Sequence, residues 1–348
     1  MPRPPSCGSE RVSGGPDYGA TPPPSRPVAV SCGDPAGVGP ELAAKAWSQL
    51  RGALPFVYLG DPDHPPSGTP ALVIADPAEA GDVSRRAVPV MRVPFAGRAR
   101  PGRLDPRHAP GVIEAVRLGV RLVQDGRCDA LCTLPIHKKA LRDGAGFAFP
   151  GHTEFLADLA GGVPVAMMLA APALRVVPAT IHIPLSEVPA ALTAQAVEQA
   201  IRLTHAALIA DFGVAAPRIA VAGLNPHAGE GGAMGREEIE IVAPVLDRLR
   251  AEGYDLAGPL SADTMFHPAA RAGYDAAVAM YHDQALIPIK TIDFAGGVNV
   301  TLGLPFARTS PDHGTALDIA GTGTADPTSF VSALLMAADM GARRRAAG

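Results

Sequence analysis

Two kinds of segment alternate along this chain from residue 27 onward, and this alternation restricts the fold more than any other feature. Short apolar runs of strand length are followed by longer amphipathic runs of helix length. The first unit reads "PVAVSC", then the glycine-rich turn "GDPAGVG", then "PELAAKAWSQL", whose leading proline suits the first turn of a helix. Repeated units of this kind predict βαβ connections and a largely parallel sheet covered by helices.

The same reading extends over the rest of the chain. Strands are predicted at 27–32, 54–60, 71–76, 128–136, 217–226, 276–281 and 296–306, and helices at 40–50, 110–126, 151–161, 193–213, 235–254 and from about 327. Residues 165–185 hold two apolar runs around Pro172, which predicts a hairpin. A hairpin within a βαβ series makes the sheet mixed, so the predicted fold class is a two-lobed, mixed-sheet α/β fold.

A chain of 348 residues with 47% hydrophobic residues can bury a large core. We predict an outer α/β lobe formed by 27–139 together with 301–348, and a central α/β lobe at 140–300. Residues 1–26 are rich in proline and glycine and have no apolar signal-peptide core, so they are predicted to be a disordered extension.

Charge and cysteine content exclude several classes of partner and compartment. The formal net charge is -4, and no Lys/Arg cluster is interleaved with aromatic residues, so neither a nucleic-acid nor a membrane partner is expected. No apolar stretch reaches the roughly 18 residues of a spanning helix. The four cysteines lack CxxC spacing and the density of a secreted framework, which predicts plain thiols in the cytoplasm.

Histidines recur where predicted strands end, and ligands bind at the carboxyl ends of strands in open α/β sheets. These residues are His137, His152, His182, His227 and His282. A single histidine in such a place is more often a hydrogen-bonded structural residue. Three neutral imidazoles with an open fourth position would form a catalytic divalent-metal site, and His182, His227 and His282 are the candidates, although their wide spacing is no local motif.

Two further groups of polar residues accompany these histidines. Asp263 and Asp283 would serve as hydrogen-bond partners of the ligands or as a base; each is alternatively a helix cap. Lys290, Asn299 and Arg308 lie beside apolar strands. Arginine grips a phosphate or carboxylate with two nitrogens and lysine acts as a point charge, so this set indicates an anionic substrate, or alternatively three unrelated surface residues.

Two glycine-rich loops, 33–41 and 313–323, would let backbone amides approach a phosphate. Neither matches the GxGxxG pattern of the Rossmann dinucleotide fold. Taken alone, each loop is more often a tight turn than a nucleotide site.

Several long motifs in one order resemble the PdxA family of pyridoxal phosphate biosynthesis, from about residue 27 to about 340. They are "GDPAGVGPEL", "PGHTEFLADL", "ATIHIPL", "GLNPHAGEGG", "GPLSADTMF", "YHDQALIPIK" and "VNVTLGLPFARTSPDHGTALDIAG". The loops "GDPAGVGPE" and "HGTALDIAG" also look like those of isocitrate and isopropylmalate dehydrogenases. The resemblance therefore implies the fold of those dehydrogenases.

The resemblance also implies a homodimer with its active site at the subunit interface, in the central lobe. One divalent ion, zinc, magnesium or cobalt, would be held by His182, His227 and His282, with His282 lent by the partner. Substrate contacts would come from His152, Thr153, Lys290, Asn299 and Arg308. The adenosine half of NAD or NADP would lie on the loop that contains His313, Gly314 and Asp318.

The activity implied by the resemblance is oxidation of 4-phosphohydroxy-L-threonine at its 3-hydroxyl by NAD(P), in vitamin B6 biosynthesis. Lys290 or Asp263 would manage the proton, and the β-keto acid formed would lose CO₂ to give 3-amino-2-oxopropyl phosphate. One alternative is a paralogous dehydrogenase of 4-phosphoerythronate, phosphothreonate or an aromatic dihydrodiol. A three-histidine metal hydrolase is a second alternative, which leaves the "HGTALDIAG" loop unexplained.

Overall fold

One continuous sheet of 12 strands forms the framework of the protein in the computed structural model, which describes residues 26–347. The predicted disordered extension lies outside the described residues, apart from Arg26. In spatial order the strands are β3 (Ala71–Val73), β4 (Val88–Arg92), β2 (Phe56–Gly60), β1 (Val28–Ser31), β5 (Ala130–Thr133), β12 (Ala307–Pro311), β11 (Val298–Leu302), β6 (Ala166–Ala171), β7 (Leu174–Pro178), β10 (Ala276–Ala279), β8 (Arg218–Ala222) and β9 (Asp255–Leu260).

The direction of the strands changes in the middle of the sheet. From β3 to β12 all neighbours are parallel, and from β7 to β9 they are parallel again. The pairs β12–β11, β11–β6 and β6–β7 between these blocks are antiparallel. The predicted mixed sheet and the predicted hairpin, which is β6–β7, are confirmed. As a result, the strands of the two blocks end at opposite edges of the sheet.

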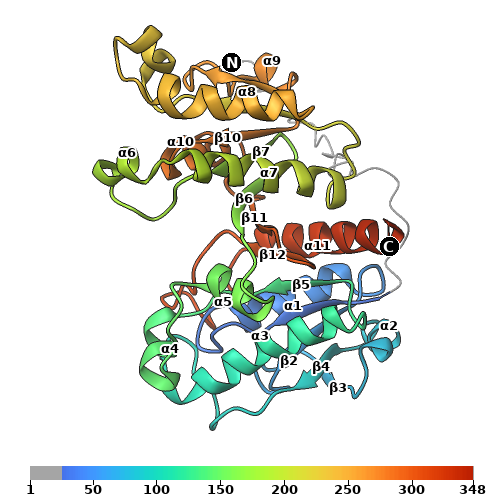
Figure 1. The fold of residues 1–348 in the computed structure, drawn as a ribbon. Helices are drawn as coiled ribbons and strands as arrows, with labels where there is room; N and C mark the ends of the chain where they lie inside the picture. Colours follow the sequence, from blue (N-terminus) through green and yellow to red (C-terminus); the bar gives the residue numbers. More distant parts are fainter. Residues whose placement is uncertain (1–25, 348) are drawn as a thin grey trace, which may run out of the picture.

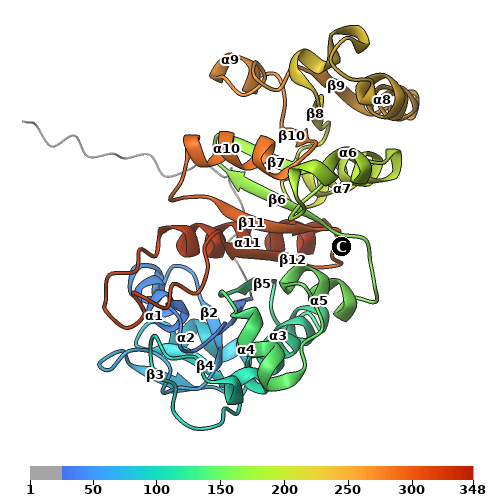
Figure 2. The same cartoon turned by 90° about the vertical axis from the view of Figure 1, so that its left-hand side faces the viewer.

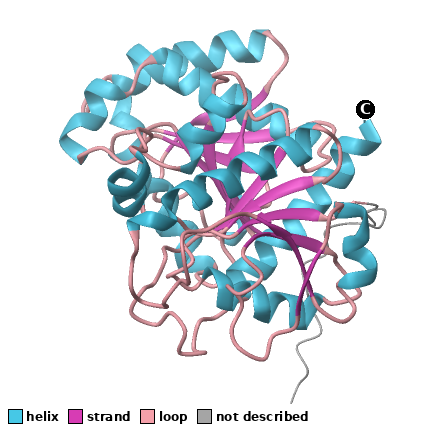
Figure 3. Cartoon of the chain, turned by 90° about the horizontal axis from the view of Figure 1, so that it is seen from below, coloured by secondary structure: helices cyan, strands magenta, loops and turns pink. Residues whose placement is uncertain are grey.

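Helices cover both faces of this sheet, and the strands run through the middle of the molecule (Figure 3). The helices are α1 (Gly39–Leu50), α2 (Ala80–Val83), α3 (Ala109–Gln124), α4 (Lys138–Ala145), α5 (His152–Leu159), α6 (Val188–Ala191), α7 (Ala194–Ala210), α8 (Ala243–Ala251), α9 (Pro268–Arg271), α10 (His282–Ile292) and α11 (Thr328–Ala347). The long predicted helices correspond to α1, α3, α5, α7, α8 and α11. Their buried residues recur at helical spacing, as in Val112, Val116 and Val120 of α3.

Two lobes are visible along the sheet (Figure 1, Figure 2). The lower lobe contains β1 to β5 with α1 to α5, and the upper lobe contains β7 to β10 with α6 to α10. Helix α11 lies between them, packed on β12. The predicted lobe boundary at residue 139 falls within the start of α4, and the structure packs α4 against α3 of the lower lobe. None of the helices in residues 26–347 is long and apolar enough to cross a membrane.

Candidate functional site

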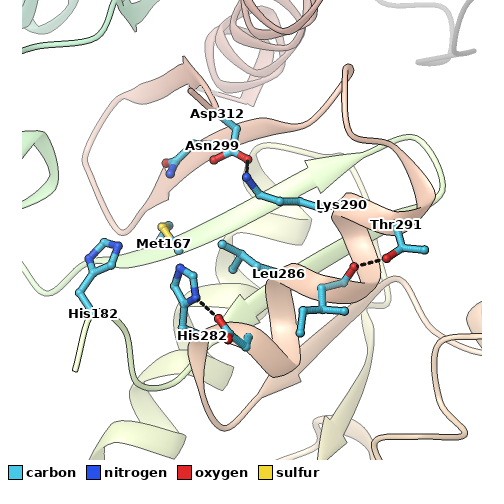
Figure 4. A pocket seen from close by; sticks show the side chains of 10 residues that line it. Met167, His182, His282, Leu286, Lys290, Thr291, Asn299 and Asp312 are labelled. Carbon is cyan, nitrogen blue, oxygen red and sulfur yellow. Dashed lines mark hydrogen bonds and ion pairs between the residues drawn. The ribbon is translucent and has the colours of Figure 1, made fainter. Parts of the chain in front are cut away.

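A pair of histidines lies where two neighbouring parallel strands end. His182 follows β7, and His282 is the first residue of α10, with two residues between it and the end of β10. Because parallel neighbours end at the same edge of a sheet, the two rings meet with their centroids 5.6 Å apart. Figure 4 shows the two rings side by side at one end of a pocket. His182 has a φ of 53°, an uncommon backbone conformation for a residue other than glycine, which places its ring at this edge.

Helix α10 forms one wall of this pocket and carries polar residues at both ends. Lys290 lies two turns beyond His282, and its Nζ is 2.7 Å from a carboxylate oxygen of Asp312 (Figure 4). The cavity has a volume of about 610 Å³. Its lining residues are Met167, His182, His282, Asp283, Leu286, Ile287, Lys290, Thr291, Asn299 and Asp312. Two predicted ligands and two predicted substrate residues therefore share one cavity.

Carboxylates hold two of the predicted metal ligands in a fixed orientation. His282 Nδ1 is 2.6 Å from Asp283 Oδ1, and His227 Nδ1 is 2.9 Å from Glu230 Oε1. A carboxylate on Nδ1 fixes the tautomer that leaves Nε2 available for a metal, the arrangement common around ligating histidines. Partial burial, followed by the nearby His282, lowers the pKa of His182 and favours its neutral, metal-binding form.

His227 and Asp263 form a separate group. His227 lies in a turn after β8 and does not line the pocket, and Asp263 accepts a 2.6 Å hydrogen bond from Ser261 Oγ. The Ser261 hydrogen bond is the main cause that lowers the pKa of Asp263, with His227 a smaller one. Within residues 26–347 no three histidine, cysteine or acidic side chains converge closely enough to hold a metal ion. The three-histidine site stays a prediction.

Arg308 is a buried cation in the middle of the sheet. It is 2% exposed, and it donates to Thr301 Oγ1 at 2.8 Å and to Thr133 Oγ1 at 2.5 Å. Its Nε has no partner, and no carboxylate among the described residues pairs with it. Burial lowers the pKa of Arg308 to about 10, because desolvation penalises the charged form. A buried charge without a counter-ion is costly, so Arg308 is a candidate for binding an anion.

Two more buried polar atoms without a hydrogen-bond partner belong to predicted substrate residues. They are Nε2 of His152, the first residue of α5, and Oδ1 of Asn299 on β11. Burial lowers the pKa of His152 well below its usual value, and the positive charges of Arg308 and Lys138 lower it further. Thr153 follows in the first turn of α5, whose free backbone amides favour an anion.

Residues of β11 connect this anion site to the histidine pocket. Side chains two apart on a strand share one face of the sheet, so Asn299 of the pocket and Thr301, the partner of Arg308, point the same way. Lys138 is near both groups, since its positive charge contributes to the lowered pKa of both His152 and His182. Sequence reasoning passed over Lys138, although it follows a predicted strand end as the histidines do.

Other predicted residues have structural or peripheral positions. His137 caps α4 by accepting a hydrogen bond from Ala140 N at 3.3 Å, which is the structural role expected of an isolated histidine. His313, Gly314 and Asp318 lie outside the pocket on an exposed loop. That loop packs against the glycine-rich turn before α1, where Val38 N donates to Thr315 O at 2.9 Å. The two glycine-rich loops are therefore neighbours.

The chain is similar to known proteins over almost its whole length. The family model of the pyridoxal phosphate biosynthetic protein PdxA matches residues 55–337. A 4-hydroxythreonine-4-phosphate dehydrogenase of Paracoccus denitrificans is 62% identical over 324 residues, which cover 92% of this chain and 99% of that protein.

Two solved structures have related folds. The crystal structure of a 4-hydroxythreonine-4-phosphate dehydrogenase from Klebsiella pneumoniae gives a TM-score of 0.82 at 38% identity, covering 91% of this chain and 100% of that one. A terephthalate 1,2-cis-dihydrodiol dehydrogenase from Burkholderia xenovorans gives 0.63 at 31% identity, covering 88% and 98%. The predicted fold class is confirmed by the Klebsiella structure as well as by the sheet.

Proposed function

Because the chain belongs to the PdxA family of pyridoxal phosphate biosynthetic proteins, we propose that it oxidises 4-phosphohydroxy-L-threonine at the 3-hydroxyl with NAD or NADP. The observation that carries this proposal is the buried, unpaired guanidinium of Arg308 beside the unpartnered His152 Nε2. A phosphorylated amino acid supplies the anion that these groups lack. The reaction would belong to vitamin B6 biosynthesis in the cytoplasm.

In this proposal the chain's own residues bind and orient the substrate. Arg308, His152 and Thr153 hold an anionic group of the substrate at the start of α5. Lys290 and Asn299 hold the rest of the molecule along α10, in the same cavity as His182 and His282. The cavity thereby fixes the 3-hydroxyl close to the histidines, and this positioning lowers the entropic part of the barrier.

Three imidazoles are suitable ligands for a divalent ion, but within one described chain the three rings do not converge, so the proposed site needs the partner subunit. His182, His227 and His282 would hold it, and the carboxylates of Asp283 and Glu230 already fix two of these rings with Nε2 free. Imidazole ligands favour zinc or cobalt over magnesium, which prefers oxygen. When bound, the ion would act as a Lewis acid that lowers the pKa of the substrate hydroxyl.

The loop that contains His313, Gly314 and Asp318 would hold the adenosine half of the nicotinamide cofactor, which would supply the hydride acceptor. For the proton we favour Lys290 over Asp263, because Lys290 lines the cavity and Asp263 does not. Oxidation at C3 gives a β-keto acid, which loses CO₂ because its carbonyl accepts the electrons. The product would be 3-amino-2-oxopropyl phosphate.

A homodimer that covers the histidine pair is supported by exposed apolar side chains around it. Ile287 of the cavity wall is 62% exposed, and Leu185, which lines a second cavity beside His182 and His282, is 68% exposed. Phe294, whose ring lies 5.7 Å from Lys290 Nζ, is 80% exposed. Large exposed apolar groups clustered at one place are typical of a surface that another subunit covers. In the proposed dimer the partner lends its own copy of His282.

The dihydrodiol dehydrogenase among the related structures supports a second candidate, a paralogue with another substrate. The test is reduction of NAD and NADP by the full chain with 4-phosphohydroxy-L-threonine, 4-phosphoerythronate, phosphothreonate and an aromatic cis-dihydrodiol. Turnover of the first alone is expected. Turnover of only one of the others would move the chain to a paralogue, and no reduction with any would favour the metal hydrolase.

A further inference from the structure

A third cavity, in the lower lobe, is strongly basic. Its volume is about 880 Å³. It is lined by Arg98, Ala99, Arg100, Pro101, Arg103, Leu104, Asp105, Pro106, Arg107 and His108. We call residues 98–108 the basic hairpin, because Arg103 N donates to Arg100 O at 3.1 Å around a turn at Gly102. Sequence reasoning missed it because glycine and proline separate its arginines.

The charge of this cavity is not balanced within the described part of the chain. Asp105 is its only acidic residue, and Arg107 occupies both carboxylate oxygens through Nε and one terminal nitrogen. Arg98, Arg100 and Arg103 have no ion pair among residues 26–347. The whole chain has a net charge of -4, so this concentration of positive charge is local. Such a cavity attracts an anion.

His108 provides an independent indication of a missing ligand. Its side chain is 3% exposed and lines the cavity, and neither Nδ1 nor Nε2 has a hydrogen-bond partner. Buried polar atoms in native structures are nearly always hydrogen-bonded. An imidazole buried in this way beside several arginines indicates a polar group that enters the cavity from outside the chain.

The basic hairpin contacts both glycine-rich loops. Gly102 N donates to Ala36 O at 2.8 Å in the first loop. A Cβ added to Gly102 would lie 3.0 Å from Leu317 O, and one added to Gly321 would lie 2.6 Å from Pro101 Cβ, both in the second loop. The cavity therefore adjoins the loop on which the cofactor is proposed to lie.

We propose that the basic hairpin binds a phosphate group of the dinucleotide cofactor through Arg100 and Arg103, with His108 as a further hydrogen-bond partner. Arginine suits this role because its planar guanidinium grips phosphate with two nitrogens. The proposal rests on the proposed function, since it needs a nicotinamide dinucleotide as ligand. Phosphate reaches the cavity from one of two sources: the pyrophosphate that NAD and NADP share, or the 2′-phosphate that only NADP has.

The test is calorimetric titration of NAD⁺ and of NADP⁺ into the full chain and into the Arg100→Ala/Arg103→Ala double variant. Arg86→Ala is the matched control, because Arg86 is an exposed arginine of the same lobe without an ion pair among the described residues. The double variant is expected to bind at least one cofactor about tenfold or more weakly, from the loss of charge-assisted hydrogen bonds. The control is expected to bind as the wild type does.

The pattern across the two cofactors identifies the phosphate. Weaker binding of both assigns the hairpin to the pyrophosphate, and weaker binding of NADP⁺ alone assigns it to the 2′-phosphate. Unchanged binding of both overturns the inference, and if the wild type still reduces a cofactor with substrate, the proposed function stands. A wild type that neither binds nor reduces either cofactor overturns the inference and the proposed function together.

Discussion

Arg308 has an environment that stability alone does not favour. Its guanidinium is buried against two threonine hydroxyls with no carboxylate partner among the described residues. Desolvation of such a charge costs free energy that the two hydroxyls offset only in part. This environment supports the proposal that Arg308 binds an anionic ligand.

We therefore expect Arg308→Met to weaken substrate binding without lowering the stability of the fold. The KM for the phosphorylated substrate should rise about 10- to 100-fold, because a charge-assisted contact is lost. The free energy of unfolding should stay unchanged or rise by up to about 2 kcal/mol, because an unpaired buried charge is removed. Denaturant unfolding and steady-state kinetics measure the two effects. A free energy of unfolding lowered by more than about 2 kcal/mol, with an unchanged KM, would show that Arg308 has a structural role.

The sequence indicated much of the site because its residues follow predicted strands. His182 and His282 could be placed together from topology, since parallel strands end at one edge. Lys138 follows a predicted strand end in the same way but was passed over. Asp312 could not be placed, because its contact is with Lys290, which lies on a different element. The separation of His227 from the pair could not be predicted either, because it depends on the left-handed turn at residues 227–231.

At the scale of elements, polar strands were the hardest to predict. β12 has the sequence "ARTSP" and is buried throughout. Its polar side chains have internal partners, as when Thr309 Oγ1 donates to Ala333 O at 2.8 Å. Hydrophobic periodicity cannot detect a strand of this kind. Strands β4 (VPVMR) and β9 (DLAGPL) are mainly apolar and were missed for another reason, since a proline within a run argues against a strand. The amphipathic helices were found because their buried stripes have the helical period.

The glycine-rich turn before α1 depends on Gly33. Its φ is 65°, and an added Cβ would lie 2.4 Å from Pro135 O. We expect Gly33→Ala to lower the free energy of unfolding by about 2–4 kcal/mol, from a left-handed backbone and a clash with a carbonyl. Denaturant melts give the value.

Gly253→Ala is the matched control for this change. Gly253 also has a positive φ, 96°, but nothing lies within 4 Å of its added Cβ. Gly253→Ala should lower the free energy of unfolding by only about 1 kcal/mol, because backbone strain is its only cost. Equal losses in the two variants would mean that the contact with Pro135 does not shape the turn.

At the scale of the whole molecule, we expect the partly buried His64 to make stability depend on pH. Burial lowers its pKa from 6.5 to about 4, Asp61 opposes this shift, and His108 adds to it. Between these two values the unfolded chain binds more protons than the folded one. Stability is therefore complete above pH 6.5 and falls as the pH falls toward 4, by about 3 kcal/mol at most for this group.

His64→Gln isolates this contribution, because glutamine does not titrate. Across the same pH range the variant should lose less unfolding free energy than the wild type. Thermal or denaturant melts at several pH values provide the comparison. Identical pH profiles for the two proteins would exclude His64 as a source of acid sensitivity.

The proposed dimer predicts complementation between inactive subunits. His182→Ala and His282→Ala should each abolish turnover. If the partner lends His282, a mixture of the two variants contains hybrid dimers in which one site keeps all three ligands, so part of the activity should return. No recovery after demonstrated subunit exchange would assign both histidines to the same chain, where their rings already lie 5.6 Å apart.

The measurement that tests the central claim most directly is cofactor reduction with 4-phosphohydroxy-L-threonine before chelation, after chelation and after zinc, cobalt or magnesium is restored. A metal-dependent dehydrogenase predicts turnover that chelation abolishes and a divalent ion restores, most strongly zinc or cobalt given the imidazole ligands. Turnover that survives complete removal of metal would contradict the three-histidine site. Absence of turnover under every condition would contradict the proposed activity itself.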